Sequence, residues 1–299
     1  MCRFRNFYCE VGAARSGTNF LGEVLSAHPL LAYWRRPKYV WRHGNAWRPD
    51  DCLRSKNARP RVKRYIRRRF HDHMAGLGKE RLLVCTQANS LALEFVNEVF
   101  PEGKIIHIIR DGREVTASQS REWQVHVRGR GQLLNRMPEV PLTDWPAYAV
   151  EFFGTLWHRY TRSKNRYSMG PKIKNWKRLR REIPGMEYSA LTWQECVGAA
   201  LRVGRAMPKD RYYEVRFEDL VLRSKETVAA LLDFMELPPA KEVDEFLESR
   251  VKRGNVGKWL SSLSQEQLQR ILPYMDELLR ELGYLQSEPV MAGDTTQSR

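Results

Sequence analysis

A glycine-bounded loop near the N-terminus is the part of this sequence best suited to chemistry. Gly12 and Gly17 stand between a short apolar run and a helix-like pattern, so successive backbone N–H groups can converge on one anion at the helix N-terminus. Their spacing matches a nucleoside triphosphate loop, but Thr18 and Asn19 replace the Lys and Ser/Thr that should follow Gly17. The loop therefore predicts binding of a phosphate-like ligand. It lacks the lysine and the Mg²⁺-binding hydroxyl that binding of a triphosphate requires.

The loop carries its own cation, Arg15. An arginine at this position can place its fork on the oxygen that joins a phosphate to a departing group, and it can stabilise the charge that develops there. The alternative is a simple glycine turn, with Ser16 or Thr18 capping the helix. The first interpretation predicts group transfer from a phosphorylated donor.

A second pair of residues can also bind an anion. Arg110 ends an apolar stretch typical of a buried strand, and Ser118 follows eight residues later in a helical pattern. Both side chains can reach one anion, and charge-assisted bonds from an arginine make such a contact strong. The alternative pairs Arg110 with Asp111 as a surface ion pair. His107, inside the stretch, is interpreted as a hydrogen-bonded core residue rather than a base.

The loop and the helix after it, residues 14–29, read ARSGTNFLGEVLSAHP. This stretch resembles the 5′-phosphosulfate loop of the sulfotransferases that use 3′-phosphoadenosine 5′-phosphosulfate, and its arginine resembles the bacterial and tyrosylprotein branches of that family. The resemblance implies that Arg15 is the cation of sulfuryl transfer. It also implies that the 5′-phosphosulfate is bound by Ser16, Gly17, Thr18 and Asn19, in addition to Arg15. Ala14 departs from the family, in which proline is common at that position.

Other segments extend the resemblance. In the family, an arginine and a serine at the separation of Arg110 and Ser118 hold the 3′-phosphate of the nucleotide. A basic, glycine-containing segment near the C-terminus resembles the one that closes over this phosphate, which implies nucleotide binding by Arg253 and Gly254. Phe217 resembles an aromatic residue that packs against the adenine, although core packing explains it equally well.

The acceptor side departs from the family pattern. Transfer to a hydroxyl needs a base within about 3 Å of the acceptor proton, and relatives commonly supply Glu or His about twenty residues after the loop. Here Arg36 lies in a segment without an acid, and Cys85 replaces a lysine that many relatives carry after their second strand. We assign His43 as the base, against the alternative of an exposed loop histidine. Less favoured candidates are Asp50, Asp51, His71 and His73.

Strand-like and helix-like patterns alternate along the chain, which predicts an α/β fold with a parallel sheet. The predicted strands are Phe7–Val11, Leu82–Thr86, Lys104–Ile109 and Tyr212–Phe217, and helical patterns follow each of them. With the resemblance, this predicts a P-loop NTPase-like, three-layer α/β/α sandwich with a mostly parallel central sheet.

One domain over residues 1–285 is expected, with a long insertion of little regular structure at 124–186 that holds an acceptor-binding surface. Residues 286–299 are expected to be disordered. The apolar runs are too short to span a membrane, and the five scattered cysteines indicate neither a disulfide framework nor a zinc site. We therefore predict a cytoplasmic protein without a membrane span.

The net charge of +16 attracts anions of any kind, so charge alone leaves nucleic acid open. The motifs favour a sulfotransferase that moves a sulfuryl group from the adenosine donor, without a metal, to a hydroxyl or amine of a glycan, a small molecule or a tyrosine-like acceptor. Several tryptophans suit stacking on a sugar or an aromatic acceptor, but none is assigned: Trp41, Trp47, Trp123, Trp145 and Trp157. The alternatives are a P-loop kinase or NTPase, and a non-enzymatic polyanion-binding protein with a degenerate nucleotide site.

Overall fold

The computed structural model describes residues 6–125, 140–150, 170–251 and 256–285. Five parallel strands form one sheet in the order β2-β3-β1-β4-β5. The strands are β1 (Phe7–Val11), β2 (Leu31–Arg35), β3 (Arg81–Cys85), β4 (Lys104–Ile109) and β5 (Tyr212–Arg216). The predicted α/β class is confirmed, and every strand pairing within the described residues is parallel.

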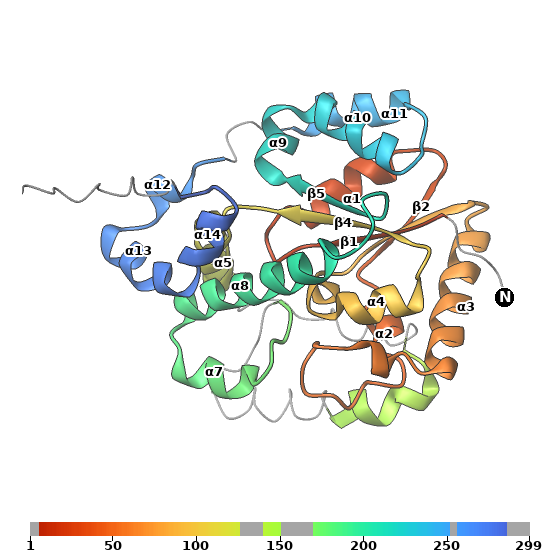
Figure 1. Cartoon of the computed structure of the whole chain (residues 1–299), viewed down its shortest axis with the longest axis horizontal. Helices are drawn as coiled ribbons and strands as arrows, with labels where there is room; N and C mark the ends of the chain where they lie inside the picture. Colours follow the sequence, from red (N-terminus) through yellow and green to blue (C-terminus); the bar gives the residue numbers. More distant parts are fainter. Residues whose placement is uncertain (1–5, 126–139, 151–169, 252–255, 286–299) are drawn as a thin grey trace, which may run out of the picture.

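Helices cover both faces of this sheet, which gives three layers (Figure 1). One face packs against α1 (Thr18–Ser26), α9 (Phe217–Leu222), α10 (Ser224–Phe234) and α11 (Lys241–Arg250). The other packs against α3 (Pro60–Gly76), α4 (Leu93–Val99) and α8 (Gly185–Gly204). Because both faces are covered, β1 is buried along its whole length and β4 is buried beyond its first residue.

The described residues form further helices and turns. They are α2 (Lys38–Trp41), α5 (Gly112–Val125), α7 (Trp176–Glu182), α12 (Trp259–Ser262), α13 (Gln265–Ile271) and α14 (Asp276–Glu281), with 3₁₀ turns at Ser55–Asn57, Gln87–Ala92, Leu142–Asp144 and Leu272–Tyr274. The register pairs Val11 of β1 with His107 of β4. The loop after β1 and the start of α5 therefore lie at the same carboxyl edge, where open α/β sheets place their ligands.

Several features differ from the sequence-based expectation. Edge strand β2 was not predicted, yet it pairs along β3 from Leu31 to Arg35. The predicted insertion does not lack structure in its described part, since Trp176–Glu182 is helical and α8 begins at Gly185. The fourth strand ends at Arg216, one residue early, because Phe217 begins α9.

Residues 126–139 and 151–169 of the insertion, Arg253, Gly254 and the tail at 286–299 lie outside the described residues. In the described part of the chain, no helix has both the length and the apolar content that crossing a membrane requires. The same part contains no group of three or more His, Cys, Asp or Glu side chains placed to hold a metal ion.

Candidate active site

The loop between β1 and α1 turns through two left-handed residues, Arg15 with φ 70° and Gly17 with φ 98°. The N–H of Ser16 donates to the Ala13 carbonyl at 3.2 Å, which closes the turn. A Cβ atom on Gly17 would stand 2.3 Å from the Phe217 ring, so a side chain fits neither the backbone conformation nor the space. The glycine that the sequence singled out is therefore required by the geometry.

The loop offers an anion two kinds of donor. Gly17 is the N-cap of α1 and no side chain caps the helix, so the N–H groups of its first turn are left to a ligand. The Ser16 side chain is fully buried, and within the described residues its Oγ atom has no hydrogen-bond partner. An unsatisfied buried hydroxyl costs about 1–3 kcal/mol, and a bound anion would satisfy it. These residues therefore fit the phosphosulfate end of the donor.

Three side chains that are far apart in the sequence meet beside this loop. The Nε atom of Arg15 donates to Ser118 Oγ on α5 at 3.1 Å. The Nη1 atom of Arg110, at the end of β4, donates to the Arg15 carbonyl at 3.2 Å. The fold thus brings the predicted phosphosulfate cation together with the predicted 3′-phosphate pair.

Arg110 is held in place from two sides. Its Nη2 atom pairs with Glu114 of α5 at 3.0 Å, and its guanidinium lies over the Phe217 ring, 4.1 Å from the centroid. Burial lowers the pKa of Arg110 from its ordinary value, although Glu114 opposes this shift. Asp111 pairs instead with Arg113, at 2.7 Å, so the surface pair Arg110–Asp111 considered from the sequence does not form.

Phe217 is brought to the site, but its described contacts are with protein. The ring is 6% exposed and packs between Gly17 and the Arg110 guanidinium. It therefore holds the loop and the arginine in their relative positions, and its predicted contact with adenine remains a prediction.

Trp259, near the C-terminus, contacts residues at the start of α5. Although Arg253 and Gly254 lie outside the described residues, the N–H of Trp259 donates to Glu114 Oε1 at 2.9 Å. The Trp259 ring also lies 3.9 Å from the Arg113 guanidinium carbon. Trp259, five residues after Gly254, is therefore held by the carboxylate that pairs with Arg110.

His43, the predicted base, has an orienting carboxylate that the sequence did not reveal. Its Nδ1 atom lies 2.9 Å from Asp144 Oδ2, and its ring lies against the Tyr65 ring at a centroid distance of 3.8 Å. Both side chains of the His43–Asp144 pair are largely buried, with 18% and 9% exposed. A histidine that donates from Nδ1 presents Nε2 as the basic nitrogen.

The other candidate bases have different surroundings. Burial alone would raise the pKa of Asp51, but Lys38 and Arg42 beside it bring the pKa below its ordinary value. On α3, His73 stacks on Trp34 at a centroid distance of 4.1 Å. Asp50 accepts from the Cys52 N–H, and His71 lies 3.6 Å from Asp72. His107 is fully buried, bonds to the Tyr212 hydroxyl at 2.7 Å and, through burial, has a pKa lowered to about 3, as a neutral core histidine should.

The segment that carries His43 is tied to the loop through Asp51. Asp51 binds Arg42, the neighbour of His43, and accepts from the Lys172 N–H at 2.8 Å. Two residues earlier, a Cβ on Gly170 would stand 3.3 Å from the Ala14 Cβ. The segment that carries His43 and the loop after β1 are therefore connected through residues 170–172.

Beneath the loop, β1 carries a carboxyl group that the sequence analysis missed. Glu10 is fully buried, and neither of its carboxyl oxygens has a hydrogen-bond partner in the described part of the chain. Burial raises its pKa well above the ordinary value. The folded protein therefore holds Glu10 protonated at pH values where the unfolded chain has already released that proton.

We expect this proton to make stability depend on pH. Above the ordinary pKa of 4.5, the unfolded state binds fewer protons than the folded state, so Glu10 lowers the free energy of unfolding as pH rises. The slope reaches about 1.4 kcal/mol per pH unit. Glu10→Gln should remove this contribution, so the variant gains stability relative to the wild type between pH 5 and pH 8. Urea unfolding at several pH values measures it, and parallel curves for the two proteins would contradict it.

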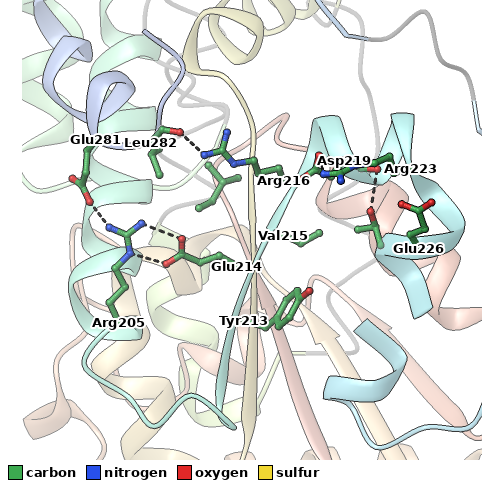
Figure 2. A pocket seen from close by; sticks show the side chains of 12 residues that line it. Arg205, Tyr213, Glu214, Val215, Arg216, Asp219, Arg223, Glu226, Glu281 and Leu282 are labelled. Carbon is green, nitrogen blue, oxygen red and sulfur yellow. Dashed lines mark hydrogen bonds and ion pairs between the residues drawn. The ribbon is translucent and has the colours of Figure 1, made fainter. Parts of the chain in front are cut away.

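Two hollows have linings that do not include the loop between β1 and α1. The larger, about 470 Å³, runs along the open edge of β5 and includes none of the predicted donor residues (Figure 2). Its charges are largely paired, since Arg205 bridges Glu214 and Glu281, and Arg223 binds Asp219. The pairing leaves little reason to place a charged substrate there.

The smaller hollow, about 350 Å³, begins one residue after His43. No carboxylate lines it, and its lining comprises Gly44, Asn45, Trp47, Arg48, Lys56, Asn57 and Arg59. The Trp47 side chain is 68% exposed. Cations together with an exposed indole suit a ring-bearing, anionic molecule.

Solved structures with the same fold are sulfotransferases. A sulfotransferase domain from the curacin biosynthetic pathway matches with TM-score 0.53 and 12% identity over 91% of this chain and 97% of that one. The sulfotransferase domain of the Synechococcus PCC 7002 olefin synthase matches with TM-score 0.53 and 14% identity over 95% of each chain. Mouse sulfotransferase SULT7A1, solved in complex with PAP, matches with TM-score 0.51 and 12% identity over 94% and 87%. At these identities the likeness establishes the fold.

Family membership rests on the sequence itself. No curated protein matches the chain. The model of the sulfotransferase family, however, matches residues 11–242, from the end of β1 through the donor loop to the start of α11. With the fold that it shares with solved sulfotransferases, this chain belongs to the sulfotransferase family.

Proposed function

We propose that the protein transfers a sulfuryl group from 3′-phosphoadenosine 5′-phosphosulfate to a hydroxyl or amine acceptor. The observation that carries this proposal is the meeting of Arg15, Arg110 and Ser118 beside an uncapped helix N-terminus. Two anion sites side by side suit a nucleotide with phosphate groups at both ends of its ribose. The mouse relative solved with PAP, the desulfonated form of this donor, supports the same choice.

The loop and its cation would act on the leaving group. The acceptor oxygen or nitrogen attacks sulfur, and the bond between sulfur and the bridging oxygen breaks with its electron pair moving to the phosphate. Arg15 and the first-turn N–H groups of α1 stabilise the charge that gathers on that phosphate. His43 Nε2 accepts the proton that the acceptor loses, and Asp144 stabilises the resulting imidazolium.

Nucleotide binding without a metal is the direct test. We expect 3′-phosphoadenosine 5′-phosphate, at 100 times its Kd and without Mg²⁺, to raise the free energy of unfolding by about 2.7 kcal/mol. For a chain of this size the melting temperature should rise by about 5 °C. Differential scanning fluorimetry with EDTA present measures the shift.

The same assay separates the alternatives. Stabilisation by ATP with Mg²⁺, and not by the adenosine bisphosphate, would favour a kinase. Stabilisation only by DNA, RNA or heparin would favour a polyanion-binding protein. The exposed arginines of α3, Arg61, Arg64 and Arg68, are the surface that such a polyanion would meet.

The His43–Asp144 pair predicts the effects of two substitutions. His43→Ala should lower kcat by about 10²- to 10⁴-fold, because the acceptor proton then has no base to receive it. Asp144→Asn keeps the shape but not the charge and should lower kcat to a smaller extent. Tyr65→Phe, which retains the stacked ring, is the matched control, and an unchanged kcat in His43→Ala would remove His43 as the base.

The acceptor itself is proposed from the smaller hollow. Its cations and Trp47 favour a glycan with an anionic group over a neutral small molecule or a tyrosine-like acceptor. A screen with labelled donor should use acceptors in matched pairs that differ only in a carboxylate or sulfate. Preference for the neutral members would overturn this choice while leaving the donor assignment intact.

A further inference from the structure

Arg36 follows the last residue of β2 and is fixed at the carboxyl edge of the sheet by its backbone. It adopts φ 58°, a left-handed conformation that is rare for arginine, and its N–H donates to the Cys85 carbonyl at 2.8 Å. The conformation turns the chain from β2 into α2. The Arg36 side chain is only partly exposed, so its surroundings restrict its direction while the backbone fixes its position.

The Arg36 guanidinium reaches the donor loop. Its Nη2 atom donates to Asn19 Oδ1 at 3.3 Å, and Asn19 lies in the first turn of α1. Next to Asn19, Thr18 Oγ1 accepts from Gln87 Nε2 at 3.2 Å. The residues that follow β2 and β3 thus hold the start of α1, on the side opposite Arg110.

The charges at the loop show what Arg36 adds. The Arg110 charge is offset by Glu114, and the Arg113 charge by Asp111. Beside them, Arg15 donates to Ser118 and Arg36 donates to Asn19, so two further guanidinium groups lie at the loop. The donor carries several negative charges, and in transfer the oxygens of the moving group also need positive partners. Arg15 by itself supplies only one positive charge against these negative charges.

The two departures from the family pattern lie next to each other. Cys85, at the end of β3, brings no charge, and burial raises the pKa of its thiol well above the ordinary value while Arg36 lowers it in part. The guanidinium therefore lies within electrostatic range of the position that lacks a cation. Arg36, in a segment without an acid, supplies a positive charge from the neighbouring strand.

We infer that Arg36 is a catalytic cation of the donor site that binds the oxygens of the sulfuryl group during transfer. This inference rests on the proposed function, since it assumes the phosphosulfate donor. Arg15 then acts on the leaving oxygen, and Arg36 acts on the group that moves. The rival role is purely structural, in which Arg36 only positions Asn19.

Binding of two nucleotides that differ only in the sulfuryl group tests the inference without turnover. In calorimetry without acceptor, Arg36→Ala should lower the affinity for the phosphosulfate donor by about 10- to 100-fold. This is the effect expected from the loss of a charged hydrogen bond. The affinity of this variant for the desulfonated bisphosphate should stay within about threefold of the wild type. Arg36→Lys should recover part of the difference, and kcat should follow the same order.

Other outcomes would overturn the inference. An equal loss for both nucleotides, or no loss for either, excludes contact with the sulfuryl group. Asn19→Ala that reproduces the sulfuryl-selective loss assigns the effect to Asn19 and leaves Arg36 a structural role. Melting temperatures of the free variants show whether each one folds. If the wild type binds neither nucleotide, the proposed function itself fails, which is distinguishable from failure of the Arg36 role.

Discussion

Arg15→Ala should lower kcat by about 10²- to 10³-fold while changing the Kd of the adenosine bisphosphate only slightly. Removing one preorganised donor from a developing oxyanion has a cost of this size. Arg15 is exposed, and its Nε atom donates to Ser118 Oγ. The first-turn N–H groups of α1 and the Arg110 guanidinium still hold the nucleotide.

The measurement is single-turnover transfer beside calorimetric titration of the bisphosphate. Arg15→Lys keeps the charge without the fork and should fall between the wild type and Arg15→Ala. Arg223→Ala is the matched control, because Arg223 is an exposed arginine that pairs only with Asp219 among the described residues. An unchanged transfer rate in Arg15→Ala would remove its catalytic role.

Arg110→Ala, unlike Arg15→Ala, should lower the affinity for the adenosine bisphosphate, by about 10²-fold or more. A partly buried guanidinium that binds phosphate contributes a strong charge-assisted contact. The variant should also lose about 3 kcal/mol of stability, because the Glu114 carboxylate, 2% exposed, is left buried without its partner.

A double variant separates these two effects. Arg110→Ala with Glu114→Gln removes the stranded charge, so it should regain much of the stability but none of the nucleotide affinity. Urea unfolding and calorimetry together measure both quantities. Recovery of affinity in the double variant would mean that Arg110 acts by holding the fold rather than by binding phosphate.

Local patterns predicted the elements that are buried on both faces. β1 and β4 have the predicted bounds because a strand covered by helices on both sides is apolar at nearly every position. β2 was missed, because an edge strand pairs on one side only and here ends in an exposed arginine, Arg35. α8 was also missed, although Ala190, Trp193, Val197 and Leu201 recur at helical spacing and are buried.

The sequence by itself determined the local geometry of the proposed donor site. Gly12, Arg15 and Gly17 lie within six residues, and Arg110 and Ser118 are separated by about two helical turns. Such short separations restrict the relative positions of these residues, because one loop or one helix fixes where its side chains point. The parallel sheet then had only to bring two strand ends together, and alternating strands and helices already implied that it would.

Only the tertiary structure decided which residues hold these groups. Asp144 stands 101 residues from His43, Glu114 meets Trp259 across 145 residues, and Arg36 is set on Asn19 by the pairing of β2 with β3. Contacts over such separations leave no pattern in a single sequence, because they depend on how whole elements pack. The sequence therefore predicted the cation of the loop, Arg15, whereas only the fold showed which residues contact it.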